Sequence, residues 1–267
     1  MFSFKKQKKF SYDETLLSAS TPFAFTEAYK MLRTNLNFVS MSGKFKKLLV
    51  TSSIPNEGKS TVAINLAITL AETGCNVLLI DCDMRNPSIH RYLRMRNIPR
   101  SGLSSILAGD TNIENSILEF RKGEKRIFDF IPVGSIPPNP AELIGSEAMK
   151  NLLDMLSSQY DYIICDTPPA TVVSDSAILS RYCDGVLLVI KQKFSTKQQV
   201  LSAKQGLETV GATILGTILN QYNIEDDRKK NSNRYGYGVY NYSYGYDSTQ
   251  KSNAKRTLSS NHARIRQ

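Results

Sequence analysis

The feature that most constrains the fold is an apolar stretch followed by a glycine-containing loop and a helix-forming segment, over residues 47–72. The loop matches the pattern G-x-x-x-x-G-K-[ST], except that Ser53 stands where the pattern has its first glycine. In such a loop, successive backbone N–H groups point at phosphate oxygens, and the start of the following helix adds a favourable dipole. The segment predicts a strand, a phosphate-binding loop and a helix. The simpler alternative is an ordinary helix capped after a glycine turn.

Side chains of this loop are suited to a nucleotide triphosphate with its metal ion. We expect Lys59 to neutralise the β- and γ-phosphates and the Ser60 hydroxyl to ligate Mg²⁺. The predicted nucleotide-binding residues of the loop are Asn56, Glu57, Gly58, Lys59, Ser60 and Thr61.

Short apolar runs alternate with longer segments along the chain, which is typical of a parallel sheet covered by helices. Strands are predicted at residues 47–51, 76–81, 127–132, 162–166, 185–191 and 214–220. Helices are predicted at residues 25–38, 59–72, 141–158, 174–182 and 196–210. The order of these elements predicts an α/β fold of the P-loop NTPase class, with a mostly parallel sheet.

Carboxylates follow two of the predicted strands. Asp81 and Asp83 end the second strand, and they face the same way if the chain remains extended. Asp166 ends another strand and precedes a Pro-Pro turn, so it is a candidate for holding a metal-bound water. Ligands of open α/β sheets bind at the carboxyl ends of strands, where these acids collect. The alternative for Asp81 and Asp83 is that they begin a loop and cap a short helix.

The net charge of +10 is concentrated at the two ends of the chain. Residues 1–10 hold four lysines, and residues 228–267 hold nine Lys and Arg against a single Asp, which leaves a slightly acidic middle. This distribution argues against a DNA-binding core, so no nucleic acid partner is expected. The basic ends fit an anionic membrane surface, a partner or an acidic site, and a solubilising role is the plain alternative.

The organisation along the chain is predicted to be a basic arm at residues 1–24, a P-loop domain at 25–226 and a flexible tail at 227–267.

The basic arm lacks the apolar stretch and cleavage site of a signal peptide, and the apolar runs of the chain are too short to span a bilayer. The four cysteines show no C-x-x-C spacing and are expected to be small buried side chains in a reducing compartment. Together these features predict a cytoplasmic protein.

The tail is crowded with tyrosine, which packing explains poorly. Its clustered tyrosines are Tyr235, Tyr237, Tyr240, Tyr242, Tyr244 and Tyr246. Taken alone, the cluster could form an edge strand or an adhesive low-complexity segment. Beside a nucleotide site, we interpret it as a set of phospho-acceptors.

These motifs together resemble the bacterial protein-tyrosine kinases, or BY-kinases. The resemblance covers the P-loop, the Asp81-x-Asp83-x-Arg85 segment, the strand ending in Asp166, two further stretches at residues 102–109 and 138–143, and the tyrosine-rich end. It implies an ATP- and Mg²⁺-dependent tyrosine kinase that phosphorylates its own tail and regulates capsular or exopolysaccharide synthesis. It also implies a separate transmembrane adaptor that activates the kinase and recruits it to the inner face of the plasma membrane.

The resemblance assigns roles to individual residues. Asp81 is the candidate base for the tyrosine proton, Asp83 shares that role or holds the metal with Ser60, and Asp166 belongs to the metal shell. Asn220, after the last strand, is a candidate contact to the adenine edge.

An N-terminal helix of the family carries the motif E-x-x-R-x-x-R, which joins subunits into a ring. The matching positions are Glu27, Lys30 and Arg33, so Lys replaces the first arginine and cannot form its bidentate contact. An ion pair between Glu27 and Lys30 within the helix is the alternative.

The alternative function is that of a ParA- or MinD-like ATPase, an assembly or positioning switch. Such proteins carry a signature lysine five residues before the P-loop lysine, and here that position is Ile54. The missing lysine, the non-basic core and the tyrosine-rich tail favour the kinase.

Overall fold

A computed structural model of the chain describes residues 16–18, 20–40, 45–95 and 97–222. By its internal contacts the chain divides into a first unit that ends at Tyr222 and a second that begins at Asn223. Only the first unit contains described residues. The basic arm up to residue 15, the predicted tail and its tyrosines lie outside the described part.

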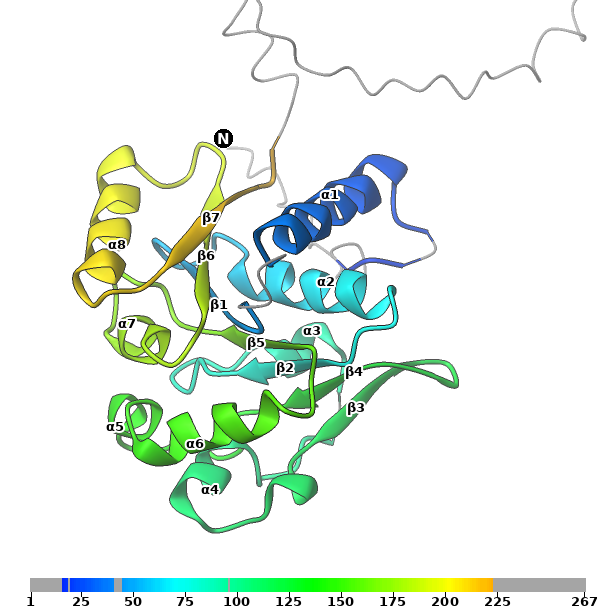
Figure 1. The fold of residues 1–267 in the computed structure, drawn as a ribbon, viewed down its shortest axis with the longest axis vertical. Coiled ribbons are helices and arrows are strands. Elements are labelled where there is room, and N and C mark those ends of the chain that lie inside the picture. The colour runs from blue at the N-terminus through cyan, green and yellow to red at the C-terminus, as the bar shows by residue number, and fades with distance from the viewer. Residues whose placement is uncertain (1–15, 19, 41–44, 96, 223–267) are drawn as a thin grey trace, which may run out of the picture. The chain divides into compact units, whose positions relative to one another are not determined.

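The first unit is built on a sheet of seven strands in the order β3-β4-β2-β5-β1-β6-β7 (Figure 1). The strands are β1 (Lys47–Ser52), β2 (Val77–Asp81), β3 (Leu118–Lys122), β4 (Lys125–Ile131), β5 (Tyr162–Asp166), β6 (Gly185–Lys191) and β7 (Ile214–Asn220). All neighbours are parallel except β3 and β4, which form an antiparallel pair at one edge. The predicted α/β fold with a mostly parallel sheet is confirmed.

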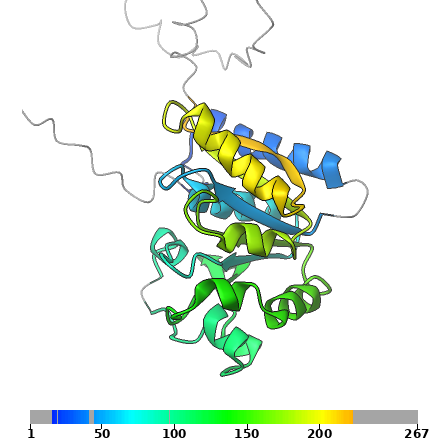
Figure 2. The same cartoon turned by 90° about the vertical axis from the view of Figure 1, so that its left-hand side faces the viewer.

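Helices cover both faces of this sheet, as the two views in Figures 1 and 2 show. They are α1 (Phe23–Ser40), α2 (Lys59–Ala71), α3 (Ile89–Tyr92), α4 (Leu103–Ala108), the 3-10 turn η2 (Ile113–Asn115), α5 (Pro140–Ile144), α6 (Glu147–Leu156), α7 (Asp175–Ser180) and α8 (Lys197–Thr209). The core accordingly forms two clusters. One joins α1 and α2 to Leu48, Val50 and Leu79, and the other joins α4, α6 and α7 to Leu49, Leu78 and Ile163. Alternate residues of a strand face opposite sides, so the apolar runs of β1, β2 and β5 serve both clusters.

One prediction about the elements is wrong, and one strand was not predicted. Residues 141–158 do not form one helix, because Gly145 and Ser146 separate α5 from α6 and the Ser146 side chain caps α6 by accepting a hydrogen bond from Met149 N. A serine favours a cap over a helix interior for this reason. Strand β3 was not predicted, because its LEFRK sequence lacks an apolar run, as suits an exposed edge strand.

Helix α1 shows how the predicted oligomer residues are used within one chain. Lys30 Nζ lies 2.8 Å from Glu27 Oε1, which is the intrahelical ion pair named above as the alternative. Arg33 Nη1 donates to Thr69 O of α2 at 2.8 Å. The ring interface stays a prediction.

Within the part of the chain that is described, the helices are all too short or too polar to cross a bilayer.

The sheet places the carboxyl ends of three central strands side by side. In the order β2-β5-β1, these ends are Asp81, Asp166 and Ser52, and the register pairs Asp81 directly with Asp166. Because these strands are parallel, the segments that follow them all leave at the same edge, where the candidate site lies.

Candidate functional site

The loop between β1 and α2 turns back sharply before the helix begins. Asn56 has φ of 67° and Gly58 has φ of 87°, both in the left-handed region, and α2 starts at Lys59. A side chain at Gly58 would be strained at this angle, and its Cβ would lie 2.1 Å from Asn220 Nδ2. The predicted strand, loop and helix are therefore present, and the loop needs a glycine before the lysine for both of these reasons.

Glu57 is a loop residue whose side chain points into the protein. It is fully buried and accepts hydrogen bonds from Ser53 Oγ (2.6 Å), Ile54 N (2.9 Å), Ser195 Oγ (2.7 Å) and Lys191 N (3.1 Å). Burial alone would raise the pKa of Glu57, but these hydrogen bonds outweigh it and lower the pKa, so the carboxylate stays charged. Its side chain fixes the loop to the β6–α8 connection and faces away from the predicted phosphate position.

Asn220 holds the same loop from the end of β7. Its Nδ2 donates to Glu57 O at 2.9 Å, beside Gly58. The side-chain amide nitrogen carries two N–H donors and this bond uses one of them, so Asn220 shapes the loop while its contact with the adenine edge stays a prediction. Neither Glu57 nor Asn220 lines the cleft described below.

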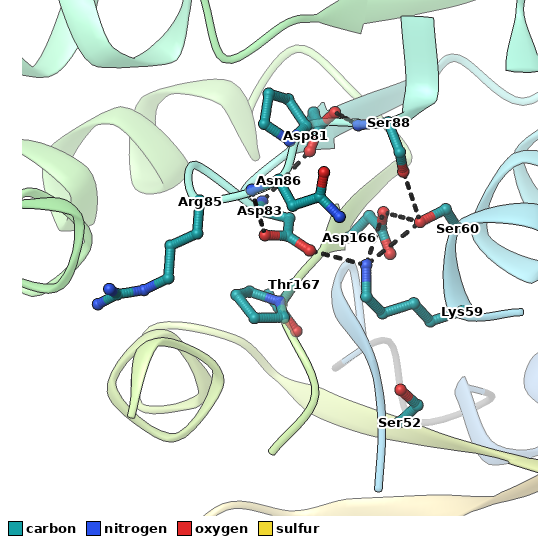
Figure 3. A network of polar contacts seen from close by, with 12 residues as sticks. Ser52, Lys59, Ser60, Asp81, Asp83, Arg85, Asn86, Ser88, Asp166 and Thr167 are labelled. Carbon is teal, nitrogen blue, oxygen red and sulfur yellow. Dashed lines mark hydrogen bonds and ion pairs between the residues drawn. The ribbon is translucent and has the colours of Figure 1, made fainter. Parts of the chain in front are cut away.

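Lys59 lies among carboxylates at the strand ends (Figure 3). Its Nζ is 3.0 Å from Asp83 Oδ2 and 3.6 Å from Asp166 Oδ2, and Ser60 Oγ donates to Asp166 Oδ2 at 2.5 Å. Burial would lower the pKa of Lys59, but the neighbouring Asp166 and Asp83 carboxylates more than compensate and raise it. Lys59 is therefore a fully charged ammonium, and the sequence correctly predicted that these groups meet.

Asp81 is the exception, because it does not face the same way as Asp83. Its Oδ1 accepts from Asp83 N at 3.2 Å, and its Oδ2 accepts from Ser88 N and Ile89 N at 3.1 and 3.2 Å. A shared direction was expected only if the chain remained extended, and strand β2 ends at Asp81. Burial and the nearby Asp166 raise the pKa of Asp81 to about 8. Asp81 therefore organises the turn behind the site, and Asp83 is the carboxylate that lines the cleft.

Asp166 has an unused oxygen that suits a metal shell. Its Oδ1 is buried without a hydrogen-bond partner, whereas both oxygens of Asp83 accept hydrogen bonds, from Lys59 Nζ and Asn86 N. Buried acceptors are rarely left unpaired, so this oxygen indicates a missing ligand. Among the described residues, no group of three His, Cys, Asp or Glu side chains could bind a metal ion without further ligands. Ser60 and Asp166 therefore fit Mg²⁺, which usually takes one or two protein oxygens beside phosphate and water.

A cleft of about 350 Å³ opens above these groups. Its floor contains Asn56, Gly58, Lys59, Ser60 and Asp83. Its outer walls contain Arg85, Asn86, Ser88, Arg91, Tyr92, Pro168, Pro169, Val172 and Val173. Of the predicted catalytic, metal and nucleotide-binding residues, the cleft lining contains Asn56, Gly58, Lys59, Ser60 and Asp83, and it lacks Glu57, Thr61, Asp81, Asp166 and Asn220. Sequence reasoning named Arg85 and the Pro-Pro turn of these walls but missed Arg91, Tyr92 and Val172, because no motif marks them.

One ion pair joins two walls of the cleft. Arg85 Nε and Nη2 donate to the two carboxylate oxygens of Asp175 at 2.9 and 3.1 Å, and Asp175 is almost completely buried. This fork-to-carboxylate geometry is the strongest form of such a contact. It fixes the turn after β2 to the start of α7.

We expect the Arg85→Ala variant to lose about 1–3 kcal/mol of unfolding free energy, because it leaves the buried Asp175 carboxylate unpaired. Solvent around the half-exposed Arg85 places the loss toward the lower end. Adding Asp175→Asn to Arg85→Ala should recover part of the lost unfolding free energy, since the asparagine amide carries no charge. Urea denaturation of both single variants and the double variant measures this. Strict additivity would show that the pair contributes nothing to stability.

The fold and the site define a class of protein before any comparison. A parallel sheet, a loop closed by Gly58 and Lys59, and a strand-end acid beside Ser60 are the elements of a P-loop nucleotide-binding protein. The protein family described as AAA domain matches residues 56–224.

Comparison with known proteins gives the family. The chain is 39% identical to tyrosine-protein kinase YwqD of Bacillus subtilis over 215 residues, which are 80% of this chain and 86% of that protein. It is 36% identical to tyrosine-protein kinase etk of Escherichia coli, of which it spans only 30%. The solved kinase domain of that enzyme superposes with a TM-score of 0.70 over 80% of each chain. The chimerical protein CapA2B2 superposes with a TM-score of 0.69 at 35% identity, over 76% of this chain and 86% of that one.

The chain belongs to the family of bacterial protein-tyrosine kinases, and it is an ATP-binding protein-tyrosine kinase. The resemblance stated from the motifs is confirmed.

Proposed function

We propose that this kinase transfers the γ-phosphoryl group of Mg²⁺-bound ATP to the tyrosines of residues 235–246 in its own tail. The observation that carries the proposal is the group of Lys59, Ser60 and Asp83 at the floor of a cleft that the P-loop borders, with the buried Asp166 in contact with Lys59 and Ser60. A cation for phosphate oxygens, a carboxylate for a proton and an unsatisfied oxygen for a metal lie within one small volume.

The transfer forms a bond between the tyrosine oxygen and the γ-phosphorus and breaks the bond to the β-phosphate oxygen, which leaves with ADP. A tyrosine hydroxyl has a pKa near ~10, so a carboxylate must accept its proton as the bond forms. Asp83 would accept this proton, since its carboxylate lines the floor of the cleft, and Asp81 would support it by accepting the hydrogen bond from Asp83 N. Lys59 stabilises the charge on the transferring group. Mg²⁺, when bound by Ser60 and Asp166, would neutralise phosphate charge in the same way.

The setting of the kinase is also part of the proposal. A separate transmembrane adaptor would activate the kinase, and the likeness to the chimerical protein CapA2B2 supports this partner. The kinase would then be cytoplasmic, recruited to the inner face of the plasma membrane, and would regulate capsular or exopolysaccharide synthesis. Glu27, Lys30 and Arg33 on α1 would contribute to a homo-oligomer, which the family resemblance describes as a ring.

Incubation of the purified full chain with γ-labelled ATP and Mg²⁺ tests the proposed acceptors, with or without the cytoplasmic segment of the adaptor. We expect label on tyrosines of residues 235–246, located by mass spectrometry. A variant with all six of these tyrosines changed to Phe should keep ATP binding and lose the label. Release of free phosphate without phosphotyrosine would refute the proposal, and label confined to other tyrosines would refute the tail as acceptor.

A further inference from the structure

Three cationic side chains line the cleft, and two of them have carboxylate partners within the protein. Lys59 pairs with Asp83 and Asp166, and Arg85 pairs with Asp175. Arg91 is the third, and it is exposed at the cleft mouth on α3. Its charge has no carboxylate partner within the described ranges, which distinguishes it from the other two.

Neutral contacts already hold the Arg91 guanidinium in place. Its Nη2 donates to Pro87 O at 3.0 Å and, more weakly, to Asn86 Oδ1 at 3.5 Å, both in the turn that follows the catalytic acids. These bonds engage one of the two terminal nitrogens. A guanidinium has five N–H donors in a planar fork that matches carboxylate and phosphate groups. Arg91 is thus oriented by the turn and retains donors for an anion.

The other outer wall of the cleft has a different chemistry. Pro168 and Pro169 follow Asp166, and Val172 is 56% exposed beside them. An apolar wall of this kind suits the ring of an acceptor tyrosine, on the proposed function. A peptide whose tyrosine ring rests on this wall and whose hydroxyl reaches Asp83 would have its neighbouring residues at the cleft mouth, where Arg91 lies.

We propose that Arg91 binds an anionic side chain that flanks the acceptor tyrosine in the substrate peptide. The inference rests on the proposed function and adds a specificity determinant to it. The anion is either an acidic residue or a phosphotyrosine, since both present oxygens to the guanidinium fork.

The spacing of the tail tyrosines makes the second source available from the enzyme's own reaction. Tyr240, Tyr242, Tyr244 and Tyr246 are two residues apart, and side chains at that spacing lie on the same side of an extended chain, about 6.6–6.8 Å apart. In a substrate peptide that binds in an extended conformation, a phosphate on one tyrosine would therefore accompany the next acceptor. One phosphorylation would make the neighbouring tyrosine a better substrate.

Synthetic peptides of residues 238–246 with Tyr242 as the one acceptor test this with the full-length kinase. Positions 240, 244 and 246 carry Phe in the neutral peptide, and either position 240 or position 244 carries phosphotyrosine or Glu in the others. We expect the KM of a phosphotyrosine peptide to be about tenfold lower than that of the neutral peptide, with kcat little changed, because one charge-assisted contact is added.

The Arg91→Gln variant should give equal KM values for all peptides, and Arg91→Lys should keep part of the preference. Arg121→Gln is the matched control, since Arg121 is a half-exposed arginine on β3 that pairs with Glu119 and does not line the cleft. A gain with Glu as large as that with phosphotyrosine identifies any anion as the ligand, and a gain with phosphotyrosine alone identifies the reaction product.

Equal KM values for neutral and anionic peptides with the wild-type enzyme would overturn the inference and leave the proposed function standing. An unchanged preference of the Arg91→Gln variant for anionic peptides would also overturn the inference and leave the proposed function standing. Phosphorylation of no peptide at all, with an ATP-competent enzyme, would contradict the proposed function, and the role of Arg91 would fall with it.

Discussion

The Lys59→Met variant is expected to lose autophosphorylation by about a thousandfold or more, the size typical for removal of a charge that stabilises a transferring phosphoryl group. The side chain is the cation nearest the strand-end acids, 3.0 Å from Asp83 and 3.6 Å from Asp166. Methionine keeps the length and the apolar stem but removes the ammonium. Initial rates of phosphotyrosine formation, with ATP and Mg²⁺ at saturating concentrations, measure the effect.

The same variant should remain folded but become less stable without nucleotide. Its carboxylates lose their cation, and breaking a buried ion pair typically costs about 3–5 kcal/mol, less what protonation of the acids relieves. Lys47→Met is the matched control, because Lys47 pairs with Asp154 away from the cleft lining. That variant should keep near-normal activity. Phosphotyrosine formation at a normal rate by Lys59→Met would show that the transfer occurs elsewhere.

The second large effect is expected for Gly58→Ala. The added Cβ meets Asn220 Nδ2 at 2.1 Å, and φ of 87° is unfavourable for any residue with a side chain. The loop must therefore move, and the backbone N–H groups that face phosphates move with it. We expect nucleotide affinity to fall by about 100-fold or more, since the φ strain and the loss of the Asn220 contact each cost about 1–2 kcal/mol. Isothermal titration with ADP and Mg²⁺ measures the affinity.

Two further variants separate the causes of that loss. Asn220→Ala in the Gly58→Ala background removes the clash but not the backbone strain, so it should restore affinity only in part. Gly206→Ala, in the middle of α8 with no atom within 4 Å of the added Cβ, is the control and should be neutral or slightly stabilising. Unaltered nucleotide binding by Gly58→Ala would contradict the conformation described for the loop.

The fold was largely predictable because its strong signals are local. Strands β5 and β6 begin and end where the apolar runs do, since buried parallel strands are continuous runs of apolar residues. Strand β3 failed because an edge strand needs no apolar run, and its pairing with β4 depends on tertiary contact. The short helices α3 and α4 also escaped prediction, since four or six residues hold too little periodicity.

The site was predictable where chemistry leaves a motif and unpredictable where it depends on the path of the backbone. Lys59 and Ser60 at the start of α2 meet Asp166 at the end of β5, as the motifs predicted. Asp81 and Glu57 were identified as site residues, but their side chains turn away to backbone and hydroxyl donors that lie up to 138 residues distant in sequence. A motif records which residue occurs and not which way its side chain points.

The ion pairs of Lys59 have a consequence for how nucleotide and metal bind. The Lys59 ammonium, which we expect to bind the phosphates, is paired with the carboxylates of Asp83 and Asp166. The phosphates of a nucleotide would therefore compete with these two carboxylates for Lys59. When phosphates displace Asp83 and Asp166 from the Lys59 ammonium, these carboxylates would be left without a cation and would bind Mg²⁺ more tightly. Each ligand therefore favours the other, and by thermodynamic reciprocity ADP should tighten Mg²⁺ binding by the factor by which Mg²⁺ tightens ADP binding. The charges of Lys59 and these acids balance one another in the structure, so nucleotide and metal would bind cooperatively.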